Sequence, residues 1–160
     1  MMMQTTVNDL LDQFQRTFRM LYEEIDRFDD KQWTAGLDSF LVPVKVAMHI
    51  VDCLDYYFSG KTGAEYPWGY RFGGGWWELP IEKLPGKSEV LAYAWEIEAR
   101  IINQFKALDD LDLLKPALIK DDAAETTLGR LVYALRHTVH HHGELSALAV
   151  YHGLQGGSWE

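Results

Sequence analysis

The sequence predicts an all-α protein, a four-helix bundle with a long loop rich in glycine and aromatic residues between its second and third helices. Two observations support this prediction. Apolar residues recur at intervals of three and four in four long segments, which is the pattern of amphipathic helices. No segment of comparable length shows the alternating pattern of a strand, and four such helices favour a bundle.

The first two helices are expected over residues 6–28 and 43–59. Thr6 offers a hydroxyl to the free backbone donors at the start of the first helix. Pro43 suits the first turn of the second helix, because its missing N–H would be unpaired there, and Gly60 ends that helix.

The third and fourth helices are expected over residues 88–108, with Ser88 as the cap, and 126–152. Segment 60–87 is long for a bundle connection. It is interpreted either as a lid over a site or as a flap that seals one end of the core. Segment 109–125 is interpreted as an acidic connector.

Length and composition restrict the class of protein. A chain of 160 residues suits one core, so residues 1–160 are interpreted as a single domain. Acidic residues outnumber basic ones 24 to 15, giving a net charge of -9, and no Lys/Arg run could follow a phosphate backbone. Nucleic acid is therefore not an expected partner.

The expected location is the cytoplasm. No stretch approaches the roughly 18 apolar residues that a membrane span needs, and the first residues lack the pattern of a signal peptide. Cys53 is the single cysteine, so no internal disulfide forms, which agrees with a reducing compartment.

Five of the six histidines lie between residues 137 and 152, a density that needs an explanation. At roughly 100° per residue, His141 lies inside the apolar face of the fourth helix and His137 lies at its edge. Their β-carbons are about 5–6 Å apart, so both imidazoles can reach one ion. His140 is expected to face solvent or a subunit neighbour, and His142 to be a hydrogen-bonded core residue. His152 is expected near the helix end, where a partly positive imidazole suits the helix dipole.

His49 lies at the edge of the apolar face of the second helix and is expected to point inward. Three buried histidines are costly unless something coordinates them. Three imidazoles with an open fourth position form a catalytic type of zinc site, which nickel, iron or copper also accept, and zinc or nickel is expected. A bundle without metal, whose histidines bond to backbone or carboxylates, is an alternative.

Two other residues are candidates for chemistry. Cys53, one turn after His49, is a fourth ligand, a nucleophile, or a small buried hydrophobe, and the last is favoured. Glu98 is expected on the apolar face of the third helix, as a general base or as a structural acceptor that pairs with Arg136 or orients a ligand histidine. Asp52 is expected on the solvated side of the second helix.

The segments VPVKVAMHIVDCLDYYF and HTVHHHGELS resemble the DinB/YfiT-like superfamily, whose last helix carries an HxxxHRGQ signature. The resemblance covers nearly the whole chain in length and helix order. It places His49, His137 and His141 at the metal-ligand positions. His142 stands where the family usually has arginine, and Glu144 where it usually has glutamine. The resemblance implies a homodimer and a metal-dependent activity, and some members look like thiol-dependent transferases or isomerases.

These observations predict a metal-dependent hydrolase, or a transferase that uses a low-molecular-weight thiol, acting on a small-molecule substrate. The rival prediction is a non-catalytic metal-binding or stress-response bundle that works through its dimer surface. A fourth metal position closed by Cys53 or Glu98 would favour the rival, because structural sites leave no room for substrate.

Overall fold

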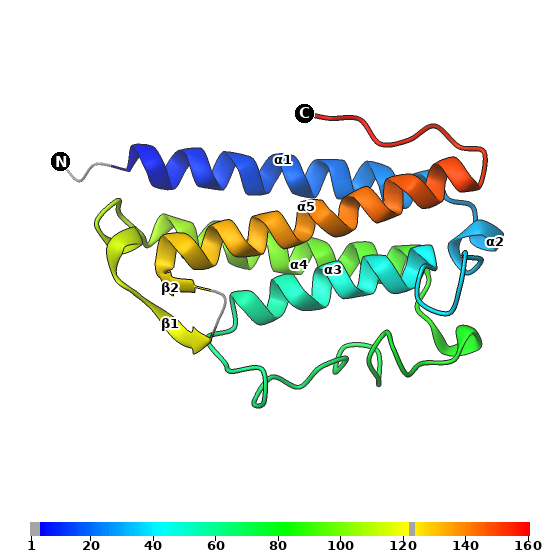
Figure 1. Cartoon of the computed structure of the whole chain (residues 1–160), viewed down its shortest axis with the longest axis horizontal. Helices are drawn as coiled ribbons and strands as arrows, with labels where there is room; N and C mark the ends of the chain where they lie inside the picture. The colour runs from blue at the N-terminus through cyan, green and yellow to red at the C-terminus, as the bar shows by residue number, and fades with distance from the viewer. Residues whose placement is uncertain (1–3, 122–123) are drawn as a thin grey trace.

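Four long helices lie side by side in the computed structural model, which describes residues 4–121 and 124–160 (Figure 1). Their bounds are α1 (Thr5–Arg27), α3 (Pro43–Tyr57), α4 (Lys87–Lys106) and α5 (Thr127–Tyr151). α1 and α3 each pack against both α4 and α5, which closes the bundle. The four predicted helices are confirmed, with their ends shifted by a few residues.

The path of the chain explains the long loop. α3 ends at the opposite end of the bundle from the start of α4, and the connection runs back along the length of α3 (Figure 1). α4 is therefore parallel to α3, and α1 is parallel to α5. Within the described ranges, no helix has both the length and the apolar character needed to cross a bilayer.

Shorter elements fill the connections. They are α2 (Asp30–Trp33), the 3-10 helices η1 (Ile81–Lys83) and η2 (Asp112–Leu114), and the antiparallel strands β1 (Pro116–Asp121) and β2 (Ala124–Thr126). The segment 109–125 was thus wrongly predicted to be a plain connector. Its strands were missed because β2 spans only 3 residues, too few for an alternating pattern to be distinguished.

Helix starts depend on contacts from elsewhere in the chain. The start of α1 makes no side-chain cap of its own, and the Asp110 carboxylate instead accepts hydrogen bonds from the backbone N–H groups of Thr6 and Val7. Ser88 was wrongly predicted to cap α4, because that helix begins one residue earlier and Gly86 takes the cap position. The Thr126 hydroxyl accepts from Gly129 N–H at 3.1 Å and caps α5 as expected.

The core lies between the four long helices. Its largest fully buried side chains are Tyr93, Phe14, Phe18, Phe28, Phe105, Leu21, Ile25, Ile50, Leu54, Ile101, Leu113 and Leu145. α3 is buried on nearly every side, because α4 and α5 cover one face and the long loop covers the other. The histidines of interest are held on this central helix and on α5.

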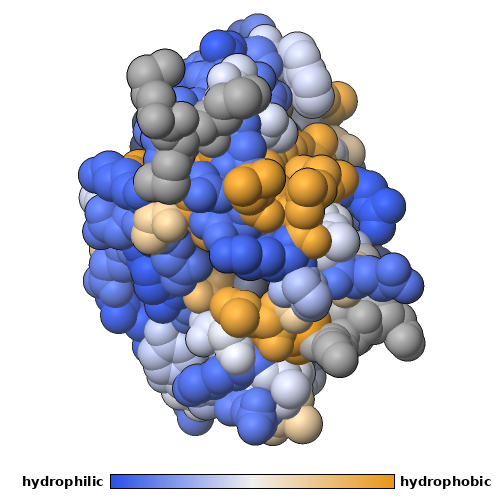
Figure 2. Space-filling model, turned by 90° about the vertical axis from the view of Figure 1, so that its left-hand side faces the viewer, coloured by the Kyte–Doolittle hydropathy of each residue, from blue (hydrophilic) through white to orange (hydrophobic). Residues whose placement is uncertain are grey.

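Apolar side chains gather at the end of the bundle that carries the strands (Figure 2). Leu111, Leu114 and Leu118 are exposed there, and Leu118 is 94% exposed. A cavity of about 370 Å³ opens near this end and is lined by residues that include Tyr57 and Leu131. None of the histidines lines it, so this cavity does not mark the histidine site.

Candidate metal centre

The rings of His49, His137 and His141 meet between α3 and α5. The centroid of the His49 ring lies 5.0 Å from that of His137 and 4.3 Å from that of His141, and the latter two rings are 4.5 Å apart. The Nε2 atoms of His49 and His141 are 3.0 Å apart. The prediction that these three imidazoles converge is confirmed.

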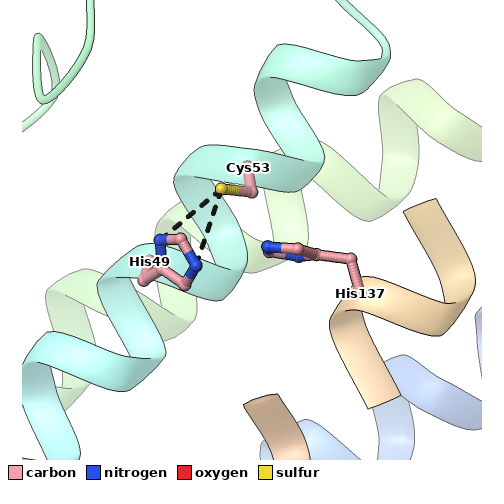
Figure 3. Close-up of side chains that lie close together, drawn as sticks. All are labelled: His49, Cys53 and His137. Atoms are coloured by element: carbon pink, nitrogen blue, oxygen red, sulfur yellow. Dashed lines mark hydrogen bonds between the residues drawn. The ribbon is translucent and has the colours of Figure 1, made fainter. Parts of the chain in front are cut away.

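Helix spacing brings Cys53 to the same place. It lies one turn after His49, and its Sγ is 3.6 Å from His49 Nδ1 (Figure 3). His49, Cys53 and His137 offer ligand atoms that all lie within 4.8 Å of one another. Burial, followed by the nearby Asp52 charge, raises the pKa of the Cys53 thiol to about 12. Without a metal the thiol is protonated at neutral pH, and it packs as the small buried residue that the sequence favoured.

Glu144 holds the ring of His141. Its Oε2 lies 2.7 Å from His141 Nδ1, so this nitrogen donates its proton to the carboxylate and Nε2 is left to face His49. A carboxylate that orients a histidine in this way is typical of metal sites, because it fixes the tautomer and makes the other nitrogen a better donor of electrons. This role of Glu144 was not predicted, although its spacing of three residues from His141 is visible in the sequence.

Burial keeps the other two histidines neutral. It lowers the pKa of His49 to about 3 and that of His137 to about 4, with smaller contributions from the neighbouring imidazoles. His137 Nδ1 is buried and has no hydrogen-bond partner in the described part of the chain. Such an atom is costly to bury, and a neutral imidazole is the form that binds metals.

These residues fit a divalent transition metal. Ligand nitrogens 2.0–2.1 Å from a tetrahedral zinc ion lie roughly 3.3 Å from each other. The 3.0 Å between His49 Nε2 and His141 Nε2 is close to that separation. Imidazole nitrogen, with or without a thiolate, suits zinc, nickel or copper better than calcium or magnesium, which prefer oxygen.

A cavity of about 220 Å³ borders two of the three imidazoles, and its walls include His49, His141 and Glu144. Trp76, from the long loop, covers this place with its ring centroid 4.8 Å from that of His49. The loop therefore lies over the histidine site, as the lid interpretation of segment 60–87 expected. The sequence did not single out Trp76 among the aromatic residues of the loop.

Glu98 lies away from the histidines, at the edge of α4 that faces α1. Its carboxylate accepts a hydrogen bond of 2.6 Å from the hydroxyl of Tyr22. The buried stripe of α4 runs through residues such as Val90, Ile97 and Ile101, and Trp95 is 55% exposed. The buried face of α4 is therefore rotated from the face that the sequence predicted, and we assign Glu98 no part in the metal chemistry.

Asp52 was wrongly predicted to be solvated. It is 6% exposed, and its carboxylate accepts hydrogen bonds from the Tyr66 hydroxyl at 3.2 Å and the Gly69 N–H at 3.1 Å. Gly69 has φ +70°, and a β-carbon there would lie 2.2 Å from the Gly74 carbonyl carbon, so only glycine allows this approach. The long loop thus uses Asp52 to fasten itself to α3.

Asp55 continues this network of buried polar groups one turn later. It accepts hydrogen bonds from the Tyr93 and Tyr70 hydroxyls and forms an ion pair with Arg100. Burial opposes its charge, but the hydrogen bonds outweigh that effect and lower the pKa of Asp55. The carboxylate is therefore charged at neutral pH and holds α3, α4 and the loop together.

The remaining histidines behave largely as predicted. The side chain of His140 is 69% exposed, and His142 is buried with its Nε2 3.3 Å from the Met20 carbonyl oxygen. His152 bonds to the Ala35 carbonyl oxygen at 2.8 Å. None of these three contributes a ring to the centre between α3 and α5.

No model of a known protein family matches the chain, and no curated protein matches it significantly. The resemblance to the DinB/YfiT-like superfamily therefore remains a prediction that rests on the two motifs and the helix order.

Proposed function

We propose that this protein binds one divalent transition metal, zinc or nickel, through His49, His137 and His141, and uses it on a small-molecule substrate. The reaction class that we propose is hydrolysis or transfer to a low-molecular-weight thiol, as in a DinB/YfiT-like protein. The convergence of three imidazoles, two of which line a cavity, supports this proposal most strongly.

The residues around the site have distinct roles in the proposed function. A divalent metal supplies Lewis acidity, which lowers the pKa of a water or thiol that it binds and polarises a carbonyl or phosphoryl oxygen. Glu144 holds His141 in the tautomer that presents Nε2. Trp76 shields His49 from solvent, which strengthens electrostatic interactions at the site. The cavity beside these residues admits a small molecule.

A second candidate is a metal-binding or stress-response bundle without catalysis. The position of Cys53 favours it, because a thiolate within reach of His49 and His137 would close the fourth position. Both candidate functions are compatible with the homodimer that the resemblance implies. Light scattering on the purified protein measures whether the protein is a dimer.

Metal analysis tests the proposal. Protein purified without nickel resin is expected to contain about one metal ion per chain, because three ligands from a folded scaffold suffice for a stable site. His49→Ala and His141→Ala are expected to lose that metal, whereas His152→Ala, whose ring bonds to the Ala35 carbonyl oxygen, keeps it. A metal-free parent, or variants with unchanged metal content, would refute the proposal.

Cys53→Ala separates the two candidates. If Cys53 closes the site, this variant binds metal more weakly, and its cobalt-substituted form lacks the absorption band of a cobalt–thiolate bond. If the fourth position is open to substrate, metal content and spectrum match those of the parent. Thermal unfolding of the variant confirms that it is folded.

A further inference from the structure

A largely buried lysine, Lys45, lies beside the candidate metal centre. It is only 8% exposed, and its ammonium donates a hydrogen bond of 2.8 Å to the Ser39 carbonyl oxygen. In the described part of the chain, no carboxylate lies within ion-pair distance of Lys45. An ammonium group has three donors, so one backbone bond leaves it poorly compensated for the loss of water.

The position of Lys45 in α3 adds to this cost. α3 begins at Pro43, so Lys45 lies in its first turn. The helix dipole places partial positive charge there, which favours anions and disfavours a cation. Two unfavourable features at one residue indicate that an anion from outside the chain compensates them.

Lys45 faces the same cavity as the histidines. It precedes His49 by one helical turn, and both side chains line the cavity of about 220 Å³. The β-carbons of such a pair are roughly 5–6 Å apart, so an anionic group at Lys45 and a reacting group at the imidazoles are separated by only a few bonds. The cavity is smaller than typical sites for drug-sized ligands, which limits the ligand to a small molecule.

The other residues that line the cavity indicate the chemical character of the rest of the ligand. Phe40, Trp76 and Val46 make one side apolar, and the rings of Phe40 and Trp76 are 6.1 Å apart. Glu144 is the other charged residue of the cavity, and its carboxylate is bonded to His141. It repels an anion from its own side, so the anionic end of a ligand is directed to Lys45.

We propose that Lys45 is a substrate-binding residue and that the substrate is a small organic anion with a flat apolar body. Its anionic group binds the Lys45 ammonium, and its body lies against Trp76 and Phe40. Its reacting group lies at the three imidazoles, so the assignment rests on the proposed metal-dependent function. Sequence reasoning missed Lys45, although its spacing of four residues from His49 is visible in the sequence.

Binding of phenylacetate and of its neutral counterpart phenylacetamide tests this inference. Both are titrated by calorimetry into nickel-loaded protein, parent and Lys45→Met, with the exposed Lys61→Met as the matched control. The parent is expected to bind phenylacetate about tenfold or more tightly than phenylacetamide, as a charge-assisted hydrogen bond predicts. Lys45→Met abolishes that preference, and Lys61→Met keeps it.

Two outcomes overturn the inference. One is equal binding of the two compounds by the parent. The other is a preference for phenylacetate that survives in Lys45→Met, because the carboxylate then binds the metal without help from Lys45. If Lys45→Met does not fold, Lys45→Gln replaces it as the neutral variant, and Lys45→Arg is expected to retain the preference.

Metal content, measured on the same samples, separates this inference from the proposed function. Metal-loaded parent without a Lys45-dependent preference refutes the subsite alone. A parent that binds no nickel refutes the metal-dependent function, and the titrations are then repeated on the metal-free protein. In the metal-free protein, a preference for phenylacetate that depends on Lys45 supports the anion subsite. The absence of this preference refutes the anion subsite as well.

Discussion

Single residues determine how well the three imidazoles are oriented to bind a metal. Glu144 acts through His141, because its Oε2 lies 2.7 Å from His141 Nδ1. It is therefore a positioning residue. The pair resembles a carboxylate–histidine arrangement in which the outer acceptor sets both the tautomer and the orientation of the ring.

We predict that Glu144→Ala weakens zinc binding by about 10–100-fold, the usual effect of removing such an acceptor. The zinc affinity of Glu144→Gln is expected to lie between those of the parent and Glu144→Ala, because the amide oxygen still accepts a hydrogen bond from His141. Competition with a chromophoric chelator measures the affinity. The exposed Glu82→Ala is the control, and equal affinities in Glu144→Ala and the parent would contradict the positioning role.

Glu24 is a second residue whose environment has a measurable consequence. It is fully buried in α1, and neither of its carboxylate oxygens has a hydrogen bond in the described ranges. The Arg27 guanidinium is 3.9 Å away and compensates only in part. Burial therefore raises the pKa of Glu24.

A raised pKa makes the charged form of Glu24 unfavourable in the folded state, so this residue lowers stability once the pH exceeds its ordinary value of 4.5. We predict that Glu24→Gln raises the free energy of unfolding relative to the parent at pH 8. The gain is expected to shrink as the pH falls towards 4, where the parent carboxyl is protonated. Urea unfolding at both pH values measures this, and a gain that is equal at both would contradict the prediction.

At the scale of elements, α3 and the long loop form one unit. α3 carries His49, and the loop supplies Trp76 above it. Asp52 and Asp55 bind the loop through Tyr66, Gly69 and Tyr70. The side of α3 that looks polar in the sequence is thus the side on which the loop is fastened.

We predict that Asp52→Ala destabilises the protein by about 1–3 kcal/mol, because it leaves the Tyr66 hydroxyl and the Gly69 N–H without their acceptor. The loop should loosen first, so limited proteolysis is expected to cut between residues 60 and 80 faster than in the parent. The exposed Asp26→Ala serves as control. Unchanged stability and unchanged cleavage would show that the loop is held by its aromatic contacts alone.

At the scale of the whole molecule, the candidate metal centre lies between α3 and α5. In the sequence these helices are separated by the long loop, α4 and the hairpin, and the three imidazoles lie where the two helices pack together. A ligand that binds only the folded state stabilises it by mass action. Metal binding should therefore be visible in the unfolding of the entire bundle.

We predict that zinc at 100 times its dissociation constant raises the free energy of unfolding by about 2.7 kcal/mol. A chelator is expected to remove this gain in the free energy of unfolding, and zinc is expected to produce no such gain in His137→Ala. Denaturant unfolding with and without chelator is the measurement. His152→Ala is expected to behave like the parent, and a gain that persists in His137→Ala would mean that zinc binds elsewhere.

The sequence alone determined the four long helices and the pairing of His137 with His141. Both depend on spacing within a helix, which is set by 3.6 residues per turn whatever surrounds it. The inward direction of His49 and the nearness of Cys53 followed from the same geometry. The short hairpin carried too little pattern to be recognised.

Only the tertiary structure decided which groups meet across elements. Periodicity identifies the faces of a helix, but it does not identify what covers each face. For that reason Asp52 was assigned to solvent although the loop buries it. Glu98 was likewise expected on the apolar face, as a general base or a structural acceptor, although it accepts a hydrogen bond from Tyr22 away from the histidines. The roles of Lys45, Trp76 and Glu144 likewise emerge only where α3, α5 and the loop enclose one cavity.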